Sequence, residues 1–219
     1  MRKSGNSINF IDKAIVFDFD GVILDTDEYI YKSFSFVRKS LGLKNISKQK
    51  FLKEFENDPK YILKCENLFL KIPYIIKLIS TLKKRSDSVE LTTGFKDLIK
   101  ESFSDFALFI CSNNLGFIIN KVLKKHGLEI YFRNIFSEGF LYKKRDALKQ
   151  IAKHYSPSDV LFITDTYKDL IEAKNSKVKT IAVSFGISPL AKLKKAKPDK
   201  IAKNITELKK HINEFRQQN

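Results

Sequence analysis

The chain has 219 residues, of which 43% are hydrophobic and 30% are charged, with only eight glycines and five prolines. This composition excludes a largely disordered protein and predicts one well-packed core with room for a small inserted module. Its two cysteines, Cys65 and Cys111, form no Cys-x-x-Cys pair, so no disulfide framework is expected and a reducing compartment fits.

The net charge and the N-terminal sequence limit the possible partners. The basic start MRKSGNSINF is followed by no signal-peptide apolar run, and no stretch approaches the roughly 18 continuous apolar residues of a membrane-spanning helix. We therefore expect a soluble, cytoplasmic protein. The net charge of +16 fits either nucleic-acid or membrane binding or a lysine-rich proteome. Because the lysines are dense only over 192–200, the second interpretation is favoured, and neither nucleic acid nor membrane is an expected partner.

Apolar runs without alternation recur along the chain, as in strands that are covered on both faces of a sheet. The first is AIVFDF at 14–19, which is followed directly by Asp20 and Gly21. Further runs lie at 106–111, 160–164 and 179–184, with a shorter candidate at 134–137. Each of these runs predicts a buried strand.

Helical patterns lie between and after these runs. The pattern at 115–126 is followed by Gly127, a typical helix stop, and apolar residues within 148–155 share one helical face. Another helix begins after Asp165, and the tail has apolar residues at helical spacing over 208–215. This alternation predicts an α/β fold with a doubly wound parallel sheet, which binds ligands beyond the carboxyl ends of its strands.

One segment interrupts the alternation. From 27 to 88 the pattern is helical and contains no convincing strand. We expect one helix over 29–41, closed by Gly42, and a second over 61–82, bent or interrupted near Pro73. The segment predicts a small helical module at 27–88, inserted into a core made of residues 1–26 and 89–219.

Two pairs of acidic residues follow predicted strands. Asp18 and Asp20 stand two apart, so their side chains point to the same side, and Gly21 lets the chain turn away. Asp165 and Asp169 follow the run VLFIT. Any one of them, Asp165 above all, could be an ordinary helix cap. Neighbouring carboxylates are costly, however, unless a cation joins them or one of them is protonated, and four acids at two strand ends favour a site for Mg²⁺.

Candidate phosphate ligands follow other elements. Ser112 comes directly after the run FALFIC and precedes Asn113 and Asn114, so a hydroxyl and backbone N–H groups could cradle a phosphate ahead of the next helix. Lys143 and Lys144 precede a helix that starts near Asp146, where a lysine could neutralise a phosphate. Alone, Ser112 would be a common N-cap and either lysine a solvated side chain.

Together, these motifs resemble those of the haloacid dehalogenase-like superfamily, in its phosphoglycolate phosphatase and β-phosphoglucomutase-like branch. They read DFDGVILDTDE, CSNN, YKKRDALKQI and FITDTYKDL in the family's order, and the tail looks like the closing strands and helix. Thr164 stands where the family usually has glycine, and Arg145 where it often has proline. The resemblance implies a Rossmann-like core and a small helical cap at 27–88, hinged near Thr26 and Asp27, which closes over the site.

The resemblance also implies roles for the site residues. Asp18 would attack phosphorus to form an aspartyl-phosphate, and Asp20 would protonate the leaving oxygen and then activate water. Mg²⁺ would be held by Asp18, the backbone carbonyl of Asp20, and Asp165, with Asp169 as a ligand or a support. Ser112, Asn113 and a lysine would bind the phosphoryl oxygens. The family lysine often lies four residues before an inward apolar residue, here Leu148, which indicates Lys144 and leaves Lys143 open.

In this family, an acidic residue at the position of Asp20 favours phosphomonoester chemistry over dehalogenation. We therefore expect a Mg²⁺-dependent phosphatase acting on a small sugar, polyol or glycolate-type phosphate, as a monomer or homodimer. A phosphomutase acting on a hexose phosphate is the alternative with the same chemistry. A basic nucleic-acid-binding protein on an enzyme-like scaffold is a more distant alternative.

Overall fold

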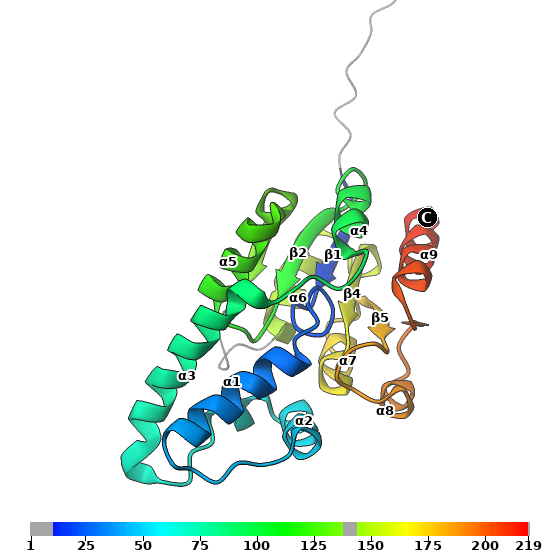
Figure 1. The fold of residues 1–219 in the computed structure, drawn as a ribbon. Coiled ribbons are helices and arrows are strands. Elements are labelled where there is room, and N and C mark those ends of the chain that lie inside the picture. The colour runs from blue at the N-terminus through cyan, green and yellow to red at the C-terminus, as the bar shows by residue number, and fades with distance from the viewer. Residues whose placement is uncertain (1–10, 138–143, 219) are drawn as a thin grey trace, which may run out of the picture.

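A parallel sheet organises the protein, as the alternation of strands and helices predicts. The computed structural model describes residues 11–137 and 144–218. Its six strands pair in the order β3-β2-β1-β4-β5-β6, and every pair is parallel (Figure 1). Their bounds are Ala14–Phe17 for β1, Ala107–Cys111 for β2, Phe132–Phe136 for β3, Val160–Thr164 for β4, Lys179–Val183 for β5 and Lys200–Ala202 for β6. This is the strand order of a doubly wound Rossmann-like fold.

Nine α-helices lie within the described residues. They are α1 (Asp27–Ser40), α2 (Lys48–Asn57), α3 (Lys71–Arg85), α4 (Phe95–Ser102), α5 (Gly116–His126), α6 (Lys144–His154), α7 (Tyr167–Lys174), α8 (Leu190–Lys195) and α9 (Ile205–Gln217). None of the helices in this part of the chain is long and apolar enough to cross a membrane.

The central strands are buried on both faces, which explains their continuous apolar sequences. Along β1, Ile15 and Phe17 pack in the larger core cluster with residues of α4, α5 and α9, whereas Ala14 and Val16 pack in a second cluster with residues of α6 and α7. All four side chains are fully buried. Helices on both faces therefore leave only the strand ends open, and these ends carry the polar residues.

The topology also fixes where a site can form. The chain leaves β1 to build β2 and β3 on one side, and then returns to β1's other side to build β4, β5 and β6. The connections of β1 and β4 thus run in opposite directions, which leaves a crevice beyond their carboxyl ends. Asp18 directly follows β1 and Asp165 directly follows β4.

The segment after β1 is helical, as expected, and α1, α2 and α3 lie together beyond the carboxyl ends of the strands (Figure 1). Its centre is aromatic: Phe51 is fully buried, with its ring 4.5 Å from that of Phe34 and 5.5 Å from that of Phe55. The first helix agrees with its prediction, and Gly42 follows it with a φ of +66°. The division into a core and a cap at 27–88 stays a prediction.

The second helix predicted in this segment is wrong in its extent. Two short 3₁₀ turns, Pro59–Leu63 and Leu68–Leu70, precede α3, which begins only at Lys71 and continues to Arg85. Pro73 therefore lies in the first turn of the helix, where its missing N–H breaks no intrahelical bond, and it does not mark a bend. The helices α2, α4 and α8 were not predicted.

The aromatic centre of the helical segment makes its stability testable. Replacing Phe51 by alanine should lower the free energy of unfolding by about 3–5 kcal/mol, because the ring is fully buried and its neighbours cannot close the cavity. Phe36→Ala is the matched control, because Phe36 is 47% exposed on the neighbouring helix α1. Urea unfolding of both variants measures the difference, and equal losses would contradict the packing described for Phe51.

Candidate active site

Asp18 lies at the centre of the site, directly beyond β1. Its backbone N–H donates to the carbonyl of Ile163 in β4 (2.9 Å), which continues the sheet pairing, and its Oδ1 accepts from the N–H of Phe19 (2.7 Å). The side chain is buried, and burial raises the pKa of Asp18 to about 7, although Lys144 acts in the opposite direction. The backbone N–H of Phe19 thus fixes the orientation of the Asp18 carboxylate. Ionising this carboxyl group costs free energy unless a further cation binds beside it.

Lys144 is the buried cation of the site. Its Nζ lies 2.5 Å from Asp18 Oδ2 and 2.6 Å from Asp169 Oδ2, and only 4% of its side chain is exposed. Burial acts to lower the pKa of Lys144, but Asp169 and Asp18 hold it well above its usual value. Lys144 likewise holds the pKa of Asp169 below its usual value, against the effect of burial. The predicted lysine therefore reaches the predicted acids, whereas Lys143 lies outside the described residues.

Thr164, the last residue of β4, joins the same network. Its Oγ1 lies 3.1 Å from Asp18 Oδ2 and 3.3 Å from Asp169 Oδ2, and it accepts from the N–H of Thr166 at 3.3 Å. The hydroxyl can therefore donate to one of the two carboxylates while it accepts from the turn that follows. Thr164, which stands where the family usually has glycine, thus contacts both Asp18 and Asp169.

Asp165 faces Asp18 from the end of β4 and has an open coordination position. Its Oδ2 accepts from the N–H of Ile187 (2.8 Å), whereas its buried Oδ1 has no hydrogen-bond partner within the described residues. Burial and the charge of Asp18 raise the pKa of Asp165 well above its usual value. An alanine methyl at Gly21 would lie 2.0 Å from Asp165 Oδ2, and one at Gly186 would lie 2.3 Å from the same atom. Glycine at both places leaves the room that this buried carboxylate occupies.

The donor chemistry fits a hard divalent cation. Among the described residues, no three His, Cys, Asp or Glu side chains are grouped closely enough to hold a metal ion. Lys144 Nζ lies between Asp18 and Asp169. Mg²⁺ needs fewer, however, since it commonly binds one or two carboxylates together with water and substrate phosphate. The unpartnered Asp165 Oδ1 and the raised pKa of Asp18 are the features that such a cation would relieve.

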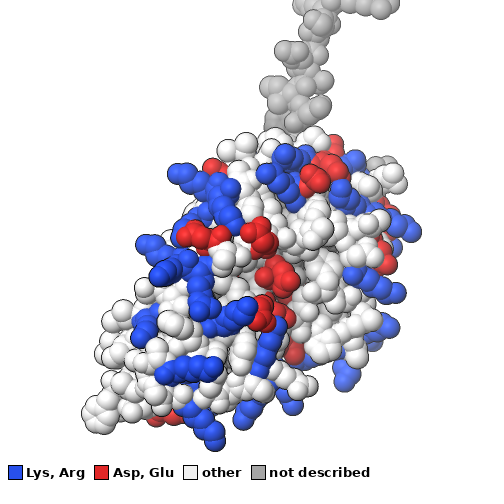
Figure 2. Space-filling model, viewed as in Figure 1, with Lys and Arg blue, Asp and Glu red and all other residues white. Residues whose placement is uncertain are grey.

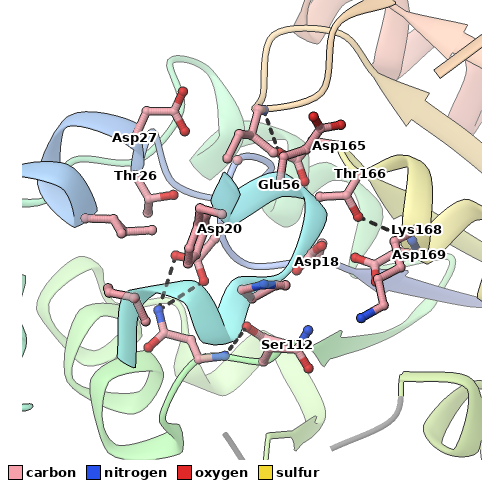
Figure 3. A pocket seen from close by; sticks show the side chains of 18 of the residues that line it. Asp18, Asp20, Thr26, Asp27, Glu56, Ser112, Asp165, Thr166, Lys168 and Asp169 are labelled. Atoms are coloured by element: carbon pink, nitrogen blue, oxygen red, sulfur yellow. Dashed lines mark hydrogen bonds between the residues drawn. The ribbon is translucent and has the colours of Figure 1, made fainter. Parts of the chain in front are cut away.

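Asp20 lies on another side of the site, toward the helical segment. Asn114 Nδ2 donates to both of its oxygens, at 3.2 Å to Oδ1 and 3.0 Å to Oδ2 (Figure 3). Burial raises the pKa of Asp20 to about 6, with the hydrogen bond from Asn114 opposing the rise. Its side chain is thus separate from the Lys144 network, so that only its backbone carbonyl remains as the predicted metal ligand. A carboxyl with this pKa can hold or release a proton near neutrality.

The predicted phosphate ligands line the same cavity. Ser112 directly follows β2 and is buried, and its Oγ accepts from the N–H of Asn114 at 3.0 Å. It is not the N-cap of α5, which is Leu115, so the helix-cap alternative does not hold. Ser112 and Asn113 both line the cavity that Asp18, Asp20 and Asp165 share.

The helical segment closes the cavity from the other side, as Figure 3 shows with Asp27 and Glu56 beside the core residues. The cavity has a volume of about 80 Å³. Tyr29 lines it and donates from its hydroxyl to the carbonyl of Leu82 at 2.7 Å. Tyr31 and Phe34 instead pack beside Phe51.

Sequence reasoning missed several residues of this cavity or its network, among them Asn114, Thr164, Glu56 and Lys168. Asn114 and Thr164 stand inside the predicted motifs, and their polar side chains at strand ends were a usable signal. Glu56 lines the cavity without a motif around it, whereas Lys168 stands inside the motif FITDTYKDL. Glu56 comes from the end of α2 and approaches the core only through the tertiary fold, so no local pattern indicates it.

The fold and the site define the class of the protein: a Rossmann-like α/β protein with acids at the topological switch point and a helical insertion above them. A family model described as haloacid dehalogenase-like hydrolase matches residues 15–183. The chain therefore belongs to the haloacid dehalogenase-like hydrolases.

Relatives and solved structures agree with this assignment. The chain is 24% identical to a pyrophosphatase PpaX of Oceanobacillus iheyensis, over 90% of this chain and 94% of that protein. It is 21% identical to a phosphoglycolate phosphatase of Vibrio vulnificus, again over 90% of this chain and 94% of that protein. A solved haloacid dehalogenase-like hydrolase from Streptococcus pneumoniae has the same fold, with a TM-score of 0.80, 21% identity and coverage of 91% of this chain and 98% of that one.

Proposed function

We propose that the protein is a Mg²⁺-dependent phosphatase that hydrolyses a small phosphomonoester through a phosphorylated Asp18. The observation that carries the proposal is the position of Asp18, fixed between the cation Lys144 and the open carboxylate of Asp165, with Asp20 two residues further on. The names of the relatives, a pyrophosphatase and a phosphoglycolate phosphatase, support phosphoryl transfer to water.

Substrate binding would use the core side of the cavity. Ser112 and Asn113 line the cavity near Asp18, and the Ser112 hydroxyl, whose oxygen accepts from the N–H of Asn114, could donate to a phosphoryl oxygen. Lys144 already contacts Asp18 and would offset the negative charge of the approaching phosphoryl group. Asp18, Asp165 and the carbonyl of Asp20 would hold Mg²⁺, which supplies positive charge that draws the phosphoryl group toward Asp18.

Chemistry would proceed in two steps on Asp18. In the first, a carboxylate oxygen of Asp18 bonds to phosphorus while the ester bond breaks, and Asp20 gives its proton to the leaving oxygen. In the second, Asp20 takes a proton from water, whose oxygen bonds to phosphorus and releases Asp18 and inorganic phosphate. The pKa of about 6 at Asp20 suits a group that must give and regain a proton near neutrality.

Metal removal tests this proposal directly. With a generic aryl phosphate, we expect release of inorganic phosphate in the presence of Mg²⁺, its loss after EDTA treatment and its recovery when Mg²⁺ is added back. We also expect Mg²⁺ to raise the melting temperature of the free enzyme, because binding to the folded site stabilises it and neutralises buried carboxylates. Phosphate release that is unaffected by EDTA would contradict the proposed metal dependence.

Two alternatives predict different results in measurements of their own. A phosphomutase would convert a hexose 1-phosphate into the 6-phosphate without releasing phosphate. A nucleic-acid-binding protein would show tight, strongly salt-dependent binding to DNA or RNA. The surface gives little support to the second alternative, because Figure 2 shows Lys and Arg scattered over the visible face and interspersed with Asp and Glu.

A further inference from the structure

The helical segment contributes an apolar wall to the cavity above Asp18. The wall side chains are Ile30, Phe55, Pro59, Ile62 and Leu82. They lie on the side of the cavity that the leaving group of a phosphomonoester would occupy, because the core supplies the phosphoryl ligands on the other. No lysine or arginine of residues 27–88, all of which the structure describes, lines the cavity. An apolar wall cannot replace the water lost by a charged leaving group.

One carboxylate is built into this wall. Glu56, near the end of α2, has a side chain that is only 8% exposed, and its Oε1 accepts from Ser188 Oγ at 2.6 Å. The same oxygen lies 2.9 Å from Lys192 Nζ, which also donates to Asn57 Oδ1 at 3.0 Å. Ser188 and Lys192 belong to the core, so their contacts hold Glu56 in place at the cavity.

The charges around the cavity disfavour a second anion. The described lining residues include six carboxylates and two lysines: Asp18, Asp20, Asp27, Glu56, Asp165 and Asp169, and Lys144 and Lys168. One of the lysines, Lys144, is already shared by two of the carboxylates. A bound Mg²⁺ would offset the charge of the phosphoryl group, so the four core carboxylates would still outnumber the two lysines. Asp27 and Glu56 add to this negative charge on the leaving-group side, where no cation of residues 27–88 lines the cavity and Lys192 pairs with Glu56 from outside the lining.

We propose that Glu56 and the apolar wall make this site selective for short phosphomonoesters whose leaving group is an uncharged, hydroxyl-bearing alcohol. A hydroxyl can donate to the Glu56 carboxylate, and a short carbon chain can contact the wall. Phosphoglycolate and pyrophosphate are disfavoured because their leaving groups are anionic. The cavity has a volume of about 80 Å³, which favours a compact leaving group. This inference rests on the proposed phosphatase function.

A matched pair of substrates tests the selectivity. 2-Hydroxyethyl phosphate and 2-phosphoglycolate have the same two-carbon skeleton and differ in a hydroxymethyl group against a carboxylate. With Mg²⁺ and the full chain, we expect kcat/KM to be at least about tenfold higher for 2-hydroxyethyl phosphate. Pyrophosphate, as a third substrate, should also be the poorer substrate despite its better leaving group.

Three variants assign the effect to Glu56. Glu56→Gln retains an oxygen that can accept from Ser188 but removes the charge, so the preference should shift by about tenfold toward phosphoglycolate. Lys192→Met leaves the Glu56 charge unpaired, so the preference should shift the other way. Glu54→Gln is the control, because Glu54 lies on the same helix outside the cavity lining and should keep the wild-type ratio.

The outcomes are distinct. Faster turnover of phosphoglycolate or pyrophosphate than of 2-hydroxyethyl phosphate would overturn the selectivity while leaving the phosphatase function intact. A ratio unchanged in both Glu56→Gln and Lys192→Met would overturn the role of Glu56. If Glu56→Gln does not fold, the Lys192→Met ratio decides alone. Hydrolysis of no phosphomonoester with Mg²⁺ would overturn the proposed function and this inference together.

Discussion

Asp18→Asn is expected to abolish phosphate release, with a loss in kcat on the order of 10⁴-fold or more, because an amide oxygen cannot form the phosphorylated intermediate. The variant should still fold, since asparagine can accept from the N–H of Phe19 through its Oδ1 as the carboxylate does at 2.7 Å. Lys144 also keeps its second partner, Asp169, at 2.6 Å. The loss therefore reports chemistry and not misfolding.

Stability against pH gives an independent readout of the same substitution. The pKa of Asp18 is raised from 3.8 to about 7 in the folded protein, so the folded state binds more protons than the unfolded state between these values. Stability therefore falls as the pH rises through this window, and the unfavourable contribution of Asp18 is fully present above about pH 7. Without metal, Asp18→Asn should be at least as stable as the wild type at pH 8.

Asp12→Asn is the control for both measurements. Asp12 is exposed and precedes the same strand, so this substitution should leave phosphate release and the melting temperature close to wild type. Phosphate release by Asp18→Asn above a tenth of the wild-type rate would contradict Asp18 as the nucleophile. Labelling with ³²P from the substrate checks the same point, because the wild type should carry acid-stable label on Asp18 and the variant none.

The parts of the fold that sequence predicts best are those in which one physical requirement decides the pattern. A strand buried on both faces must be apolar throughout, and the run VLFIT at 160–164 coincides with β4. Asp18 and Asp165 could be placed at one edge because parallel strands bring their carboxyl ends together. The strand β3 is shifted from its prediction, 134–137, because its exposed side chains at Arg133 and Asn134 interrupt the apolar pattern.

The site residues and helices that could not be predicted from the sequence depend on contacts between segments that lie far apart in the chain. Asn114 reaches Asp20 across 94 residues, and Glu56 reaches Ser188 across 132, so neither contact leaves a local pattern. The elements of the helical segment were harder to predict than those of the core, for a related reason. Its apolar residues serve a small aromatic centre around Phe51, and 3₁₀ turns with the same apolar content as a helix precede α3. The spacing of apolar residues alone does not distinguish a 3₁₀ turn from an α-helix.

Asp20→Asn has the second-largest expected effect, and that effect depends on the leaving group. For an alkyl phosphate, the alkoxide needs a proton as the ester bond breaks, so kcat should fall by about 10²–10⁴-fold. For p-nitrophenyl phosphate, the phenolate leaves without a proton, so the first step should be much less affected. The second step still lacks its base, because asparagine cannot take a proton from water.

The variant should therefore release nitrophenolate in a burst of about one equivalent per enzyme and then turn over slowly, with phosphorylated Asp18 accumulating. Stopped-flow absorbance measures the burst, and the ³²P label measures the intermediate. In the wild type, Asn114 Nδ2 lies 3.0 Å from Asp20 Oδ2. Asn114 can still donate to the amide oxygen of the substituted side chain, so that side chain should stay in place. Asp25→Asn is the matched control, because Asp25 is exposed in the same segment after β1. A uniform loss for both kinds of substrate, with no burst, would show that Asp20 positions the site and does not transfer the proton.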